Sequence, residues 1–174
     1  ASSDPRRPRF VYLHLLSPHD PYCFHEGYTE RHLEELGVTA SPETCLRQPD
    51  LQKQANPSDT TKRLVSALYR GEVEQVDGRV GELLTILEGQ RRDREVWLFL
   101  ISDHGEELWE HGAVGHARTL FEEVIHVPLL VQPPRGADIP VDRGITTPVS
   151  TIDLSHSWLE LAGLAPPPSV SGRS

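Results

Sequence analysis

Residues 96–107, VWLFLISDHGEE, join a run of apolar side chains directly to a cluster of polar ones. The run 96–101 has the length and composition of a buried strand in an α/β sheet. It ends at Asp103 and His104, and Gly105 then allows the chain to turn away sharply. Because the sites of open α/β sheets form beyond the ends of their strands, this stretch indicates a functional edge of such a sheet.

Asp103 and His104 carry the donor atoms of a metal site. The carboxylate offers hard oxygen and the imidazole offers nitrogen to a divalent cation. Neighbouring residues of a strand point to opposite faces, so both reach one ion only if the chain leaves strand geometry at Ser102. The alternative is that Asp103 caps a helix, with Glu106 and Glu107 placed favourably in its first turn.

The composition indicates one soluble globular domain, because 174 residues with 37% hydrophobic and 25% charged side chains are ordinary for that class. The formal charge of −9 opposes nucleic-acid phosphates and anionic membranes, so we expect no nucleic-acid partner. No apolar segment approaches the roughly 18 residues that a membrane span needs. The sequence contains no methionine, which suggests a processed chain or an excised piece.

Two cysteines, Cys23 and Cys45, lie in one loop-rich stretch. They are compatible with one disulfide or with two free thiols, because a single pair has no framework spacing. The surrounding region 22–56 contains two prolines and little periodicity beyond a short helical pattern at 28–36. We interpret it as an excursion over the surface.

Apolar periodicity predicts the remaining elements. Residues 10–16 form a short apolar strand that leads into a proline-rich turn carrying His19. Residues 59–89 repeat apolar side chains every three to five positions after a capping segment, which predicts a long amphipathic helix. Residues 127–131 form another strand, and residues 147–163 begin extended and become a capped helix. A Pro/Ser/Gly tail, 165–174, departs from the packed unit.

A helix between two strands implies a right-handed crossover and parallel pairing. The fold class is therefore α/β, with a mainly parallel sheet flanked by helices.

Two further histidines, His111 and His116, lie among glycines in a segment that on its own predicts a solvated loop. His19, taken alone, is most simply a turn histidine bonded to its own loop.

Five segments, in this order along the chain, favour the functional interpretations of these residues over the structural ones. They are residues 10–22 (FVYLHLLSPHDPY), 69–77 (YRGEVEQVD), 102–106 (SDHGE), 115–130 (GHARTLFEEVIHVPLL) and 150–163 with 172–174. Together they resemble the sulfatases of the alkaline phosphatase superfamily. The resemblance implies an alkaline-phosphatase-like mixed, mainly parallel sheet, present here as an incomplete domain.

The resemblance also implies roles for individual residues. Asp103 and His104 match a pair of metal ligands, usually for Ca²⁺, with Mn²⁺, iron or Zn²⁺ in some relatives. His19 matches a histidine that contacts the transferred sulfuryl or phosphoryl group. His116 matches a basic residue over the anion and leaving oxygen, with Arg118 as the competing candidate. Such a cation and basic side chains stabilise developing charge, and His116 or His19 protonates the departing oxygen.

The family's nucleophile has no counterpart here. Its members carry an earlier pair of aspartates and a Cys-x-Pro-x-Arg or Ser-x-Pro-x-Arg signature whose first residue becomes formylglycine; neither Cys23 nor Cys45 lies in such a signature. The resemblance therefore covers the central to C-terminal part of a catalytic domain and not the N-terminal half. We expect this chain alone to be inactive and its half of the metal shell to bind weakly.

The sequence thus favours part of a metal-dependent sulfuric ester hydrolase, acting on a sulfate-ester small molecule or glycan. One alternative is a phosphodiesterase, phosphonate monoester hydrolase or phosphoethanolamine-type transferase of the same superfamily, acting on a phosphate ester. Another is a truncated paralogue that serves as a binding module. The N-terminal portion of the domain is an expected partner, and sulfatases are commonly extracytoplasmic.

Overall fold

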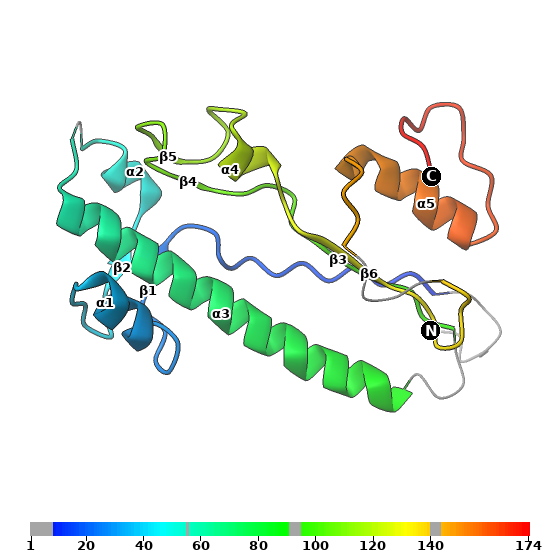
Figure 1. Cartoon of the computed structure of the whole chain (residues 1–174), viewed down its shortest axis with the longest axis horizontal. Helices are drawn as coiled ribbons and strands as arrows, with labels where there is room; N and C mark the ends of the chain where they lie inside the picture. The colour runs from blue at the N-terminus through cyan, green and yellow to red at the C-terminus, as the bar shows by residue number, and fades with distance from the viewer. Residues whose placement is uncertain (1–8, 55, 91–94, 140–143) are drawn as a thin grey trace. The chain divides into compact units, whose positions relative to one another are not determined.

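A computed structural model describes residues 9–54, 56–90, 95–139 and 144–174 (Figure 1). The chain divides into two compact units, and each is described by itself. The larger unit is His14–Ala137, and the smaller unit combines Ala1–Leu13 with Asp138–Ser174. None of the described helices has the length and apolarity that crossing a membrane requires.

Helix α3, Asp59–Gln90, is the longest element of the larger unit (Figure 1). It begins after Ser58, whose Oγ accepts a hydrogen bond from the backbone N–H of Thr61 at 3.1 Å. The predicted amphipathic helix 59–89 is therefore confirmed, with an end one residue later. Its N-terminal half is the buried one, since Val65, Ala67 and Leu68 are fully enclosed.

Short elements from the region 22–56 cover this half of α3. They are β1 (Tyr22–Cys23), α1 (Glu30–Leu36), β2 (Cys45–Leu46) and α2 (Gln48–Leu51). Their apolar side chains join those of α3 and of the β4–β5 hairpin in one core cluster, made of Tyr22, Leu51, Val65, Leu68, Trp109 and Val114. The region expected to run over the surface thus supplies core residues, since elements of two to seven residues bury single side chains without periodicity.

The two cysteines form a disulfide. Cys23 and Cys45 face each other in the antiparallel β1–β2 pair, with their Cα atoms 4.1 Å apart. Of the two states compatible with the sequence, the structure has the bridged one. It holds the chain that enters from His19 against the chain that leads into α2.

All strand pairs among the described residues are antiparallel. Strand β3 (Leu98–Ile101) pairs with β6 (Leu129–Gln132), and β4 (Glu107–Leu108) pairs with β5 (Val114–Gly115). The parallel pairing expected from a helix at 59–89 between the strands 10–16 and 96–101 is not seen among these pairs. The chain between β3 and β6 forms a small hairpin and the four-residue helix α4 (Glu122–Ile125), which is no crossover helix.

Residues 10–16 belong to no strand pair within the described part of the chain, so the strand expected there is not observed. Their large apolar side chains are exposed, with Val11 83% and Leu16 73% accessible. A strand requires a hydrogen-bonded neighbour, and apolar composition alone does not supply one. The mainly parallel sheet is likewise not seen in the described residues.

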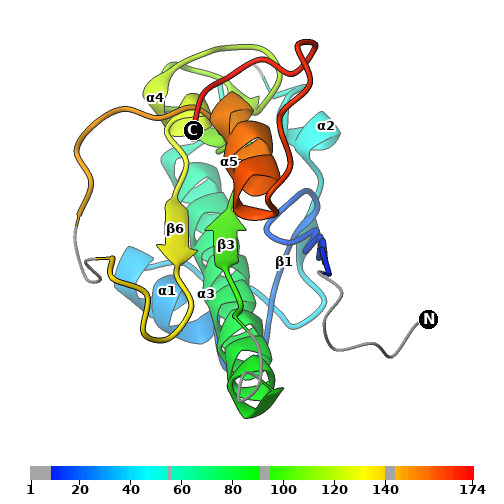
Figure 2. The same cartoon turned by 90° about the vertical axis from the view of Figure 1, so that its right-hand side faces the viewer.

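The smaller unit contains η2 (Thr151–Asp153) and α5 (Leu154–Leu161) (Figure 2). Ser150 and Asp153 form a capping box, in which the Ser150 N–H donates to Asp153 Oδ2 at 3.1 Å. The predicted capped helix is confirmed. The tail differs from expectation, because the Arg173 N–H returns to Asp153 Oδ1 at 3.0 Å.

Candidate functional site

The chain leaves strand geometry where the metal hypothesis requires it. Strand β3 ends at Ile101, and Asp103 and His104 lie in the turn that follows. Oδ1 of Asp103 and Nε2 of His104 are 3.8 Å apart, close enough for both atoms to bind one ion. No helix follows Asp103, so the alternative that it caps a helix is wrong.

The neighbouring backbone fixes the ring of His104. Its Nδ1 donates to the carbonyl oxygen of Gly105 at 2.8 Å, which leaves Nε2 as the nitrogen with a free lone pair. The Asp103 side chain is 77% exposed, and its Oδ1 also accepts the His104 N–H at 3.1 Å. These two donors fit half of a divalent-metal shell. Among the described residues no third histidine, cysteine or carboxylate completes a group of ligands around them.

Three of the histidines singled out from the sequence come together. The ring of His116 stacks on that of His104 with centroids 3.9 Å apart, and the ring of His19 meets His116 edge-on at 5.2 Å. His19 lies in the turn before β1, and His116 follows β5. Segments far apart in the sequence thus place three imidazoles side by side.

Each of these rings is anchored through Nδ1. In His19, Nδ1 donates to the Asp20 carbonyl oxygen at 3.0 Å, and in His116 it donates to Oε1 of Glu106 at 3.0 Å. With His104 bonded in the same way to Gly105, all three rings offer Nε2 for chemistry. This common orientation is what a site for an anion or a metal requires.

Glu106 was not predicted as a site residue. Its side chain is only 4% exposed, and it positions His116 through their hydrogen bond. Glu106 also lies beside the buried Tyr22, whose pKa is raised first by burial and then by this carboxylate. In the sequence only the adjacent pair Glu106 and Glu107 could have indicated such a residue, and this pair fits the first turn of a helix equally well.

Gly115 provides the backbone conformation that places His116 at the site. Its φ is 104°, a left-handed conformation that L side chains rarely adopt, and a Cβ there would overlap the side-chain amide of Gln48. The N–H of Gln48 in turn donates to Oδ1 of Asp20, the neighbour of His19. Helix α2 thus lies against both histidine-bearing segments.

Arg118 binds elsewhere. Its Nη2 donates to Oε1 of Gln52 at 2.7 Å, and the Gln52 amide donates to the Val114 carbonyl oxygen at 3.1 Å. The guanidinium therefore holds the hairpin to the end of α2. Of the two residues that competed for the basic position, His116 is the one that contacts the other histidines.

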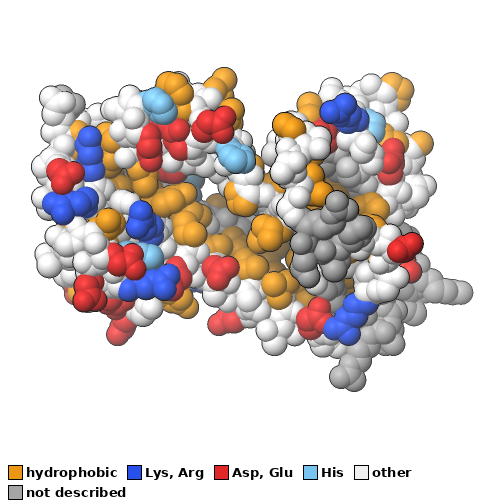
Figure 3. Space-filling model, in the orientation of Figure 1, with side chains coloured by type: hydrophobic (Ala, Val, Ile, Leu, Met, Phe, Trp, Pro, Cys, Tyr) orange, Lys and Arg blue, Asp and Glu red, His pale blue; other side chains and the backbone are white. Residues whose placement is uncertain are grey.

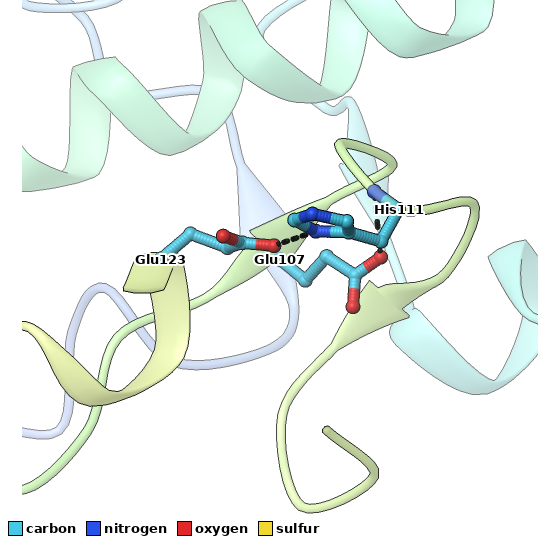
Figure 4. A group of neighbouring side chains, drawn as sticks. All are labelled: Glu107, His111 and Glu123. Carbon is cyan, nitrogen blue, oxygen red and sulfur yellow. Dashed lines mark hydrogen bonds and ion pairs between the residues drawn. The ribbon is translucent and has the colours of Figure 1, made fainter. Parts of the chain in front are cut away.

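A second group of metal-type donors lies in the same loop region. It consists of Glu107, His111 and Glu123, whose ligand atoms all lie within 4.8 Å of one another (Figure 4). The loop containing His111 was expected to be solvated. The His111 side chain is indeed exposed, at 44%, but its ring also stacks on Phe121 at 3.6 Å, and its Nδ1 lies 2.5 Å from Oε1 of Glu123.

Comparisons with known proteins bear on the family of this chain. The sulfatase family profile matches residues 1–164. The chain is 28% identical to the uncharacterized sulfatase YidJ of Escherichia coli over 164 residues, which is 90% of this chain and 32% of that protein. It is 33% identical to arylsulfatase K of Xenopus laevis over 112 residues, covering 64% of this chain and 20% of that enzyme.

A solved structure is similar as well. The phosphonate monoester hydrolase SpPMH from Silicibacter pomeroyi superposes with a TM-score of 0.61 and 26% identity, covering 87% of this chain and 30% of that one. The chain thus spans about a third or less of the length of the relatives it matches. By the extent of the family match, this chain belongs to the sulfatase family.

Proposed function

We propose that this chain is the part of a sulfuric ester hydrolase that supplies two metal ligands and the imidazoles facing the sulfuryl group. The observation that carries the proposal is the convergence of His19, His104 and His116, each with Nδ1 anchored and Nε2 available. Family membership supports the same reaction class.

In this proposal Asp103 and His104 hold a divalent cation. The family favours Ca²⁺, whereas the imidazole donor suits Mn²⁺ or Zn²⁺. When bound, the cation supplies positive charge beside the oxygens of the transferred group. His116 lies against His104 and is held by Glu106; in its doubly protonated form it donates the Nε2 proton to the departing oxygen and is left neutral, while the Nε2–H of a doubly protonated His19 donates a hydrogen bond to an equatorial oxygen.

The nucleophile in this proposal, a formylglycine, belongs to the family's N-terminal portion, which is also the partner that completes the metal shell. The substrate is a sulfate-ester small molecule or glycan. The Cys23–Cys45 disulfide supports an extracytoplasmic location, because oxidising compartments preserve such bonds.

Kinetics of the full reading frame that contains this chain test the proposal. We expect hydrolysis of 4-nitrophenyl sulfate that a chelator abolishes, with no turnover by residues 1–174 alone. Asp103→Asn and His116→Ala should each lower kcat/KM by roughly 100-fold. The control is His126→Ala, an exposed histidine that pairs with Glu122 at 3.6 Å. Full activity of the Asp103 or His116 variant would contradict the assignment.

A second candidate is phosphonate monoester hydrolysis, which the structural similarity to SpPMH favours. The ratio of kcat/KM for 4-nitrophenyl sulfate to that for 4-nitrophenyl phenylphosphonate decides between the two ester classes. Absence of turnover of either ester by the full reading frame, together with no shift of its melting temperature by Ca²⁺, supports the binding-module alternative instead.

A further inference from the structure

Glu107, His111 and Glu123 form a cluster apart from the Asp103–His104 pair. They come from β4, from the turn between β4 and β5, and from α4, and Figure 4 shows the Glu123 carboxylate bonded to the His111 ring and the Glu107 carboxylate bonded to the His111 backbone N–H. Nothing in the proposed hydrolysis uses them. We propose that these three side chains bind a Zn²⁺ ion that fixes the β4–β5 hairpin to α4.

The first ligand is held in place before any ion binds. Glu107 is buried, with 1% of the residue exposed. Its Oε1 accepts the backbone N–H groups of His111 at 3.2 Å and of Ala113 at 2.9 Å, and its Oε2 accepts the Thr119 hydroxyl at 3.2 Å. A carboxylate has about four acceptor positions, so Oε2 keeps one for a cation.

The second and third ligands already face each other. The His111 ring is stacked on Phe121 with an angle of 15° between the planes, which fixes the direction of Nδ1. Nδ1 lies 2.5 Å from Oε1 of Glu123, so a hydrogen bond joins these atoms in the absence of an ion. Zn²⁺ binds such atoms at about 2.0–2.2 Å. It takes the place of the proton of this hydrogen bond, which is released to water, while the side chains move apart slightly.

Charge supports an ion at this place. Within the described part of the chain, Glu107 forms no ion pair with a lysine or arginine, although buried carboxylates are ordinarily paired. With His111 protonated, the cluster still has one more negative than positive charge. A divalent cation with a neutral imidazole balances both carboxylates.

The donor set selects Zn²⁺ over Ca²⁺. One imidazole nitrogen and two carboxylate oxygens are ligands that Zn²⁺ accepts in a four-coordinate site, with water in the fourth position. Ca²⁺ needs six to eight oxygens, which this cluster does not have. Because the loop between Glu107 and Glu123 carries His116, the ion stabilises the segment that presents this histidine.

Zn²⁺ titration of the chain, in a variant with Asp103→Asn and His104→Ala, tests the proposal independently of catalysis. We expect one Zn²⁺ per chain by calorimetry and a higher melting temperature with Zn²⁺ than with EDTA. Adding His111→Ala or Glu123→Gln should weaken Zn²⁺ binding by at least roughly tenfold and remove the melting shift. His126→Ala is the matched control and should keep both.

Two results would overturn the site: no Zn²⁺ binding in the parent variant, or equal affinity after His111→Ala. Circular dichroism without metal checks that each variant folds. Thr119→Val is the milder second variant, because it removes only the bond that orients Oε2 of Glu107. It should weaken Zn²⁺ binding by roughly 10-fold while leaving all three ligands present.

Discussion

Glu72 carries a carboxyl group into the core of the larger unit. It is 2% exposed, and its Oε1 accepts the Cys23 N–H at 2.7 Å. Its Oε2 is buried without a hydrogen-bond partner. Burial, with a smaller contribution from Asp20, raises the pKa of Glu72 to about 7 against the opposing effects of the Cys23 N–H and of His19. The group is therefore neutral in the folded chain under mildly acidic conditions.

This raised pKa makes stability fall as pH rises. Between the ordinary value of 4.5 and about 7, the folded chain binds the Glu72 proton and the unfolded chain does not. The free energy of unfolding therefore decreases across that window, by about 3 kcal/mol. Glu72→Gln should remove this decrease. Urea unfolding at several pH values from 4.5 to 8 measures it, with Glu82→Gln, an exposed position on α3, as the control.

Equal pH dependence of the free energy of unfolding in the Glu72 and Glu82 variants would show that the buried carboxyl group has no such effect.

Among the site residues, the family resemblance predicted that Asp103, His104, His19 and His116 belong to one site, and the structure brings the three histidines together. Glu106 was missed because a buried carboxylate is recognisable only from its partners.

Two glycines of α3 differ in their surroundings. A Cβ on Gly71 would overlap the Thr29 hydroxyl and lie 3.0 Å from its Cα, whereas a Cβ on Gly81 would meet nothing within 4 Å. Thr29 precedes α1 and is fully buried. α3 therefore approaches the residue that precedes α1 closely at Gly71, and Gly81 has no such constraint.

The same substitution should have opposite effects at these two positions. Gly71→Ala should lower the free energy of unfolding by about 1–3 kcal/mol through overpacking. Gly81→Ala should raise it by about 0.5–1 kcal/mol, because alanine is the better helix former. Chemical denaturation of both variants measures the two values. Stabilisation by both substitutions would mean that Thr29 and α1 move away from an alanine at position 71 without loss of folding free energy.

Local signals explain which elements were predictable. Helix α3 and α5 have capping residues and apolar periodicity within their own sequence, and both are confirmed. The direction of the β3–β6 pair depends on how a distant segment returns, which no local pattern encodes. Strands of two residues, such as β4 and β5, are too short to show an alternation.

At the scale of the whole chain, many large apolar side chains reach the surface. Figure 3 shows hydrophobic side chains on the face turned to the viewer. In the smaller unit Val11 is 83% exposed, and in the larger unit Leu130 on β6 is 57% exposed. Exposed apolar groups in such number are typical of surfaces that contact another part of a protein.

Residues 1–174 alone should therefore bind the dye ANS and self-associate at rising concentration. Val11→Lys combined with Leu130→Lys should reduce both effects, at little cost in stability because both positions are exposed. Thr60→Lys, a change at an exposed polar position, serves as the control. Dye fluorescence and sedimentation velocity measure the outcome. A monomer without dye binding would show that these side chains are shielded.

The Cys23–Cys45 bridge affects what happens when the chain is cut. A protease that cleaves at the exposed residues Pro42 or Glu43 leaves two fragments, one carrying His19 and the other carrying His104 and His116. The disulfide keeps the fragments covalently joined, so the nicked protein migrates as one species until a reductant separates it. The bridge thus lets this backbone segment be broken without the histidines being lost from one another.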